Sequence, residues 1–164
     1  MRIFLIGFMG AGKSAIGREL AARLGYRHLD TDKLIEDLKG KSISQIFEDE
    51  GEAHFRELES RVLDHLSKHQ NLIISTGGGM PMQGNNWERI SALGRTVFLD
   101  ADLDEIKERV ARKNTRPLLQ TTDPMQTLLA LYQERRPLYE RAEVQVQTKG
   151  LAKAEVVDLI IRAL

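Results

Sequence analysis

The chain has 164 residues, of which 41% are hydrophobic and 29% are charged, a composition typical of a folded globular protein. Its 24 basic residues balance its 24 acidic residues, so the overall charge favours neither nucleic acid nor an anionic membrane as a partner. The lack of cysteine excludes disulfides and thiol chemistry, and no run approaches the ~20 apolar residues of a membrane span. We therefore expect one cytoplasmic domain over residues 1–164.

The chain begins with a short apolar run that is followed by a glycine-rich loop. Residues 3–6 suit a strand buried on both faces of a parallel sheet, and residues 7–14 read G-x-x-x-x-G-K-S before an amphipathic helix. This order is typical of a phosphate-binding P-loop, whose backbone N–H groups surround a polyphosphate. We expect Lys13 to reach the β and γ phosphates and Ser14 to join the coordination of Mg²⁺. The motif predicts binding of a nucleoside triphosphate.

Four further apolar runs alternate with helical segments along the chain. The runs predict strands at residues 26–29, 71–75, 96–99 and 144–147. Helices are expected from the P-loop to Gly25, at 42–47 and 52–68, from Asn86 as the cap to residue 92, around 103–110, from Pro124 toward 141, and at the end of the chain, where Val156, Leu159, Ile160 and Leu164 form the buried face. Residues 113–124 lack helical periodicity and are interpreted as a mobile loop.

Short apolar strands separated by helices predict an α/β fold, in which helices cover both faces of a parallel sheet. Ligands of such folds bind at the carboxyl ends of the strands. The P-loop follows the first strand, Asp30 and Asp32 follow the second, and the triple glycine at residues 77–79 follows the third. We therefore expect three separate loops to converge on one crevice.

Several polar residues near this crevice have two interpretations. Asp30 and Asp32 can hold Mg²⁺ and position an acceptor hydroxyl, or one of them merely caps the helix that begins near Lys33. The triple glycine is either an ordinary turn or a place where the backbone approaches a ligand closely. Arg56 and Glu59 have a spacing that allows a solvated surface ion pair or a shared orientation toward a site.

Two other basic positions are open to the same question. Arg135 and Arg136 are either surface cations or part of a site. Arg116 lies in the loop next to Pro117, and a flexible segment that carries one cation suits a lid that closes over phosphates. The four histidines have neither metal-ligand nor triad spacing, so we interpret them as structural or solvated.

Six motifs occur in order along the chain: GFMGAGKS at 7–14, LDTD at 29–32, FRELE at 55–59, STGGG at 75–79, RPLL at 116–119 and RRPLY at 135–139. Over nearly its whole length the chain therefore resembles the shikimate kinase family. The resemblance implies a three-layer P-loop kinase fold like that of nucleoside monophosphate kinases, with a five-stranded parallel sheet of order 2-3-1-4-5. It implies a substrate-binding region at about 31–60 and a mobile lid at about 112–124. It also implies a monomer that transfers the γ-phosphoryl group of ATP to the 3-hydroxyl of shikimate.

The resemblance also implies roles for single residues. Asp32, Lys13 and Arg116 would be catalytic, and Asp32 would orient or deprotonate the acceptor hydroxyl. Ser14 and Asp30 would hold Mg²⁺, Asp30 through water. ATP would be bound by Gly10, Ala11, Gly12, Lys13, Ser14, Ala15, Arg112 and Arg116, with Arg112 against adenine. Shikimate would be bound by Asp32, Arg56, Gly77, Gly78, Gly79 and Arg135, with Glu59 orienting Arg56.

Competing functions make different demands on the same residues. A gluconate or nucleotide kinase on the same scaffold is one rival, but the arginines at 56 and 135 together with the triple glycine favour shikimate. A GTPase switch is disfavoured because no N-K-x-D motif occurs. A non-catalytic ATP-binding regulator would be free to lose Lys13, Asp32 or Arg116, and all three are present.

Overall fold

The computed structural model describes residues 1–113 and 117–164. Its centre is one parallel sheet with the strand order β2-β3-β1-β4-β5, which confirms the predicted fold class and order. The strands are β1 (Arg2–Ile6), β2 (Arg27–Asp30), β3 (Leu72–Ser75), β4 (Arg95–Asp100) and β5 (Val144–Gln147). Residues 3–6 of β1 are fully buried, because helices cover both faces of the central strands.

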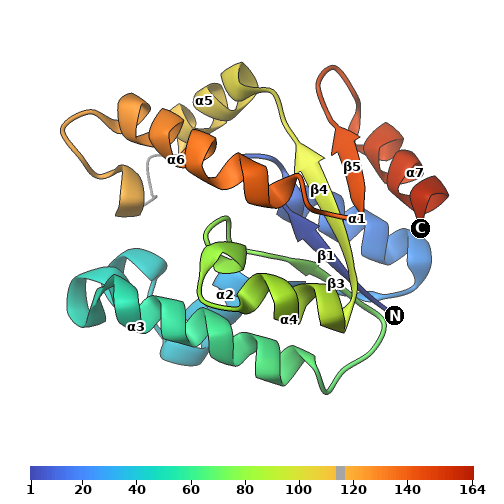
Figure 1. Cartoon of the computed structure of the whole chain (residues 1–164), viewed down its shortest axis with the longest axis horizontal. Helices are drawn as coiled ribbons and strands as arrows, with labels where there is room; N and C mark the ends of the chain where they lie inside the picture. Colours follow the sequence, from blue (N-terminus) through green and yellow to red (C-terminus); the bar gives the residue numbers. More distant parts are fainter. Residues whose placement is uncertain (114–116) are drawn as a thin grey trace.

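Helices cover both faces of this sheet. They are α1 (Lys13–Leu24), α2 (Thr31–Lys39), α3 (Ile43–Leu66), η1 (Met80–Met82), α4 (Asn86–Leu93), α5 (Leu103–Arg112), η2 (Pro117–Leu119), α6 (Pro124–Tyr139) and α7 (Lys153–Ala163). Figure 1 shows α1 and α7 side by side on one face, and α3 with α4 on the other. The carboxyl ends of the strands point toward the region between α3 and α6. In parallel α/β folds, ligands bind at this end of the sheet.

Local sequence signals set most of the helix ends. Ser42 begins α3 through a capping box, in which its hydroxyl accepts from the Gln45 N–H while the Gln45 side chain accepts from the Ser42 N–H. Gly51 interrupts α3 with φ 84° and ψ 163°, a conformation that is open to glycine, so the two helices predicted here are two halves of one element. Gly25 ends α1 as predicted.

Three expectations about helices need correction. Asn86 does not cap α4: the cap is Asn85, while the buried Asn86 amide donates to the Met80 carbonyl oxygen at 2.9 Å. Leu159 is 41% exposed, because the apolar stripe of α7 runs through Val157 instead. The loop expected at 113–124 contains the 3₁₀ turn η2.

No helix within the described ranges has the length and apolar character needed to cross a lipid bilayer.

Pro137 does not break α6. It lies on an exposed face of the helix, which continues to Tyr139 and ends two residues before the predicted end.

Candidate active site

The P-loop connects β1 to α1 and forms the first part of the site. Gly12 adopts φ 92° at the start of α1, a left-handed conformation that suits glycine and turns the chain into the helix. Lys13 follows it, and its ammonium group donates to the carbonyl oxygens of Gly7 at 2.7 Å and Phe8 at 2.9 Å. The positive end of α1 and the Lys13 charge therefore face the same cavity.

That cavity has a volume of about 370 Å³ and is lined by the P-loop, by the end of β2 and by the last turn of α5. Its lining includes the predicted residues Gly10, Gly12, Lys13, Ser14, Ala15, Asp30, Asp32 and Arg112. The predicted Ala11 is buried beneath the loop. The size and the mainly polar and basic lining suit a polyphosphate.

Asp30 and Asp32 both line this cavity. The Asp30 carboxylate caps α2 by accepting from the Lys33 N–H at 3.2 Å, and it also accepts from the Ser14 hydroxyl. The capping interpretation is therefore correct for Asp30, but it does not exclude a second role beside the P-loop. Asp32 lies in the first turn of α2 and lines both this cavity and the next one.

The contact between Ser14 and Asp30 shows whether the residues at the P-loop are suited to bind Mg²⁺. It places a hydroxyl and a carboxylate oxygen together at the P-loop, and oxygen is the donor that Mg²⁺ prefers. In residues 1–113 and 117–164, no group of three or more His, Cys, Asp or Glu side chains could hold a metal alone. A pair of oxygen donors without a full protein cage fits a Mg²⁺ ion that is bound mainly by substrate phosphates.

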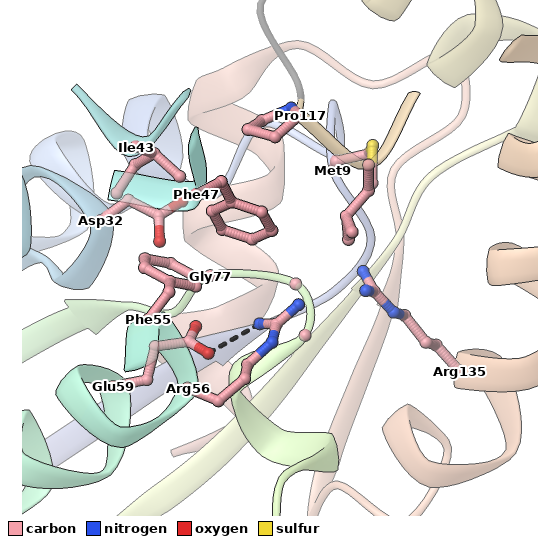
Figure 2. Close-up of a pocket in the computed structure, with 13 residues that line it drawn as sticks. Met9, Asp32, Ile43, Phe47, Phe55, Arg56, Glu59, Gly77, Pro117 and Arg135 are labelled. Atoms are coloured by element: carbon pink, nitrogen blue, oxygen red, sulfur yellow. Dashed lines mark hydrogen bonds and ion pairs between the residues drawn. The ribbon is translucent and has the colours of Figure 1, made fainter. Parts of the chain in front are cut away.

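A second, smaller cavity adjoins the first and has a volume of about 60 Å³. Arg56 from α3 and Arg135 from α6 line one part of it, and Asp32 lies at a distance from both (Figure 2). Phe47 and Phe55 form an apolar wall, with their ring centroids 5.0 Å apart. The rest of the lining is Met9, Ile43, Glu59, Gly77, Gly78, Gly79, Pro117 and Leu118.

Arg56 and Glu59 form a buried ion pair. The Arg56 Nη1 atom lies 2.6 Å from Glu59 Oε1, and Figure 2 shows the pair beside the cavity. Glu59 is 0% exposed, and burial raises its pKa to about 7, although the Arg56 charge opposes this shift. The interpretation as a solvated surface pair is therefore wrong. A carboxylate this deep holds the guanidinium in one orientation.

Arg135 is also buried, with 5% of its surface exposed, but it differs from Arg56. Among the described residues it forms no ion pair with Asp or Glu, and its guanidinium lies 5.9 Å from the centroid of the Phe8 ring. A buried cation without a direct ion pair is costly, so this position favours an anionic ligand. Its neighbour Arg136 is structural, because it binds the Asp100 carboxylate through two hydrogen bonds of 2.6 and 2.7 Å.

The triple glycine lies between these functional side chains. A Cβ atom on Gly77 would lie 2.6 Å from Asp32 Oδ1, and one on Gly79 would lie 2.6 Å from Arg56 Nη1. Any larger residue would therefore displace one of the two charged groups. The loop therefore packs closely against two charged side chains and is not an ordinary turn, while its close approach to a ligand stays a prediction.

The structure brings most of the predicted residues together. Ala11 does not line the larger cavity, Arg112 lies on its rim with a side chain that is 77% exposed, and Arg116 lies outside the described residues. Sequence analysis missed Arg109, whose guanidinium donates to the Gly10 carbonyl oxygen at 2.8 Å and lines the same cavity. Its position three residues before Arg112 on the same helix face was the available signal.

A P-loop beside a carboxylate, with a separate cationic cavity at the carboxyl ends of a 2-3-1-4-5 parallel sheet, defines a small-molecule kinase of the nucleoside-monophosphate-kinase-like fold. Comparisons with known proteins then give the family. The family model "Shikimate kinase" matches residues 9–164. The chain is 47% identical to the shikimate kinase of Ruegeria pomeroyi over 163 residues, which cover 99% of this chain and 84% of that protein.

The solved structure of shikimate kinase from Acinetobacter baumannii in complex with shikimate superposes with a TM-score of 0.94 at 39% identity, covering 98% of this chain and 90% of that chain. The chain belongs to the shikimate kinase family, and it is an ATP-dependent enzyme with shikimate kinase activity. A gluconokinase from Sinorhizobium meliloti has a TM-score of 0.62 at 16% identity over 99% of this chain and 90% of that chain, which shows a shared fold alone.

Proposed function

We propose that the larger cavity binds MgATP, that the smaller one binds shikimate, and that the γ-phosphoryl group passes between them to the 3-hydroxyl. Shikimate is a small carboxylate with three hydroxyls, so its site needs cations at one end and an acceptor for a hydroxyl proton at the other. The observation that carries the proposal is Arg135, a buried guanidinium with no ion-pair partner among the described residues, in a cavity that also contains Arg56 and Asp32.

The acceptor site recognises its substrate through charge and shape. Arg56 and Arg135 bind the carboxylate, since a planar guanidinium offers two parallel hydrogen bonds to it. Glu59 orients Arg56 through the 2.6 Å hydrogen bond. The ring of shikimate lies along the backbone of residues 77–79 and against the apolar wall of Phe47 and Phe55.

Phosphoryl transfer requires alignment and charge stabilisation more than covalent participation by the protein. Asp32 orients the 3-hydroxyl and takes its proton as the new O–P bond forms and the bond from the γ-phosphorus to the bridging β,γ oxygen breaks. Lys13 and Arg116 stabilise the charge on the transferring group. Mg²⁺, held through Ser14 and through Asp30 by way of water, would supply charge neutralisation between the phosphates.

The remaining assignments complete the proposal. Residues 1–164 act as one domain and as a cytoplasmic monomer, with a lid at about 112–124 that closes over bound substrates and limits hydrolysis by water. Arg112 packs on adenine, while Ala11 and Ala15 contribute to the nucleotide site. Arg109, which lines the same cavity as Arg112, stabilises the P-loop through its hydrogen bond to the Gly10 carbonyl oxygen.

The test is ADP release from MgATP with shikimate, gluconate or a nucleoside monophosphate offered separately. We expect rapid turnover with shikimate alone. Turnover with gluconate would keep the P-loop and Asp32 roles but overturn the acceptor assignment, because gluconate has a flexible chain in place of a ring. Absence of turnover with all three, despite measurable ATP binding, would overturn the catalytic proposal.

A further inference from the structure

The hydroxyl group of Tyr139 is hydrogen-bonded to the middle residue of the glycine loop, which lines the smaller cavity, here called the acceptor cavity. Tyr139 is 1% exposed and donates to the carbonyl oxygen of Gly78 at 2.5 Å. It lies four residues after Arg135 in α6, so the two side chains share one face of the helix. None of the sequence motifs for the P-loop or the paired aspartates predicts this hydrogen bond.

Side chains and backbone from three parts of the site surround Gly78. A Cβ atom there would lie 3.3 Å from Arg135 Nη1 and 3.5 Å from both the Met9 backbone nitrogen and the Tyr139 hydroxyl oxygen. The P-loop, the glycine loop and α6 therefore meet around one residue. A change in how the Gly78 carbonyl is hydrogen-bonded will move the wall of the acceptor cavity.

The Gly78 carbonyl oxygen is an acceptor that needs a donor in a buried environment. The Tyr139 hydroxyl is bonded to it, and the Arg135 guanidinium lies near the same residue, with Nη1 3.3 Å from the position of a Cβ atom on Gly78. Burial raises the pKa of Tyr139 to about 12, although the Arg135 charge opposes the shift, so the hydroxyl keeps its proton at neutral pH.

We infer that Tyr139 is a positioning residue for the acceptor site: it satisfies the Gly78 carbonyl and thereby keeps the Arg135 guanidinium available for the carboxylate of the substrate. The inference rests on the proposed role of Arg135. Without the hydroxyl, the buried carbonyl needs another donor, and the Arg135 guanidinium beside Gly78 can supply one. A guanidinium bonded to the protein backbone is a weaker ligand for a carboxylate.

Tyr139→Phe removes the hydroxyl and keeps the ring, which packs beside Phe98 with centroids 5.5 Å apart. We expect KM and Kd for shikimate to rise about tenfold, the scale of one charged hydrogen bond, while KM for ATP stays within about twofold. The matched control is Tyr132→Phe in the same helix, since its hydroxyl accepts from Arg136 Nη1 at 2.7 Å. It should leave KM for shikimate within about twofold.

Arg135→Gln in the same assays separates this inference from the proposed function. If Arg135→Gln weakens shikimate binding and Tyr139→Phe does not, the positioning role is refuted while the acceptor site stands. If Arg135→Gln has no effect on shikimate binding, the proposed acceptor site is itself refuted. A lower melting temperature for Tyr139→Phe with unchanged KM for both substrates would show a structural role only, and would also overturn the inference.

The double variant supplies the sharpest outcome. Because Tyr139 acts through Arg135, adding Tyr139→Phe to Arg135→Gln should raise the shikimate Kd by no more than about twofold beyond Arg135→Gln alone. Additive effects of the two substitutions would overturn the proposed connection, because they would mean that Tyr139 affects shikimate binding independently of Arg135.

Discussion

The phosphate end and the carboxylate end of the site are built in opposite ways. The phosphate end is built around a run of consecutive residues, 7–14, whose backbone leads into the N-terminal end of α1. The carboxylate end gathers buried and partly buried side chains from α2, α3 and α6, so residues about a hundred positions apart in the chain share one cavity. On the proposed assignment, a local motif recognises the common phosphate and the tertiary fold recognises the particular acceptor.

The two ends also differ in how they tolerate charge. Lys13 is only partly buried and donates to carbonyl oxygens of its own loop. Glu59 and Arg135 have almost no access to water, so their charges depend on each other, on Arg56 and on a ligand. Substitutions at the carboxylate end should therefore affect stability and binding together.

The largest expected effect concerns Asp32, which lies between the two ends. Asp32→Ala should lower kcat by roughly 10²–10⁴, the range for loss of a general base, while the Kd for a non-hydrolysable ATP analogue stays within about twofold. Steady-state turnover and calorimetric titration measure the two quantities. The matched control is Asp37→Ala on the same helix, because the Asp37 carboxylate forms an exposed ion pair with Lys33 and lines neither cavity. Intact turnover with lost nucleotide binding would contradict the assignment.

A smaller effect should appear in stability at the carboxylate end. Burial raises the pKa of Glu59 to about 7 from an ordinary value of 4.5, so the folded protein retains a proton that the unfolded chain releases between these values. The free energy of unfolding of the wild type should therefore fall as pH rises through this window, by up to about 3 kcal/mol relative to Glu59→Gln, and then level off. Urea unfolding at each pH measures the difference. A difference between the two proteins that stays constant with pH would refute this account of Glu59.

The contrast between the two ends also explains what could be predicted from sequence. The P-loop and the parallel sheet could be predicted because an apolar run, a glycine loop and an amphipathic helix are each recognised from neighbouring residues in the sequence. Capping of α2 by one of the two aspartates was one of the two interpretations that the local pattern left open, and Asp30 is the cap. The Gly78–Tyr139 hydrogen bond and the contact between Arg109 and Gly10 join distant segments, so local patterns do not predict these contacts. Helical spacing places Arg109 on the same face as Arg112 and gives no more than that.

Two errors have the same physical origin. Asn86 carries a good capping side chain, but its amide is buried, where it donates to Met80 and accepts from the Ser60 hydroxyl. Leu159 fits an apolar helical stripe, but the orientation of α7 against the sheet buries Val157 instead. Tertiary packing decided both positions. Arg56 and Arg135 were assigned to the acceptor site through family resemblance, because their spacing alone was equally compatible with a solvated surface.

The central claim is that the two ends bind different ligands independently, and two variants test it most directly. The Kd values for shikimate and for a non-hydrolysable ATP analogue with Mg²⁺ would be measured by calorimetry for wild type, Lys13→Gln and Arg135→Gln. Arg135→Gln should weaken shikimate binding by about tenfold or more and leave the nucleotide Kd within about twofold, and Lys13→Gln should do the reverse. Equal weakening of both ligands by either variant would contradict the account.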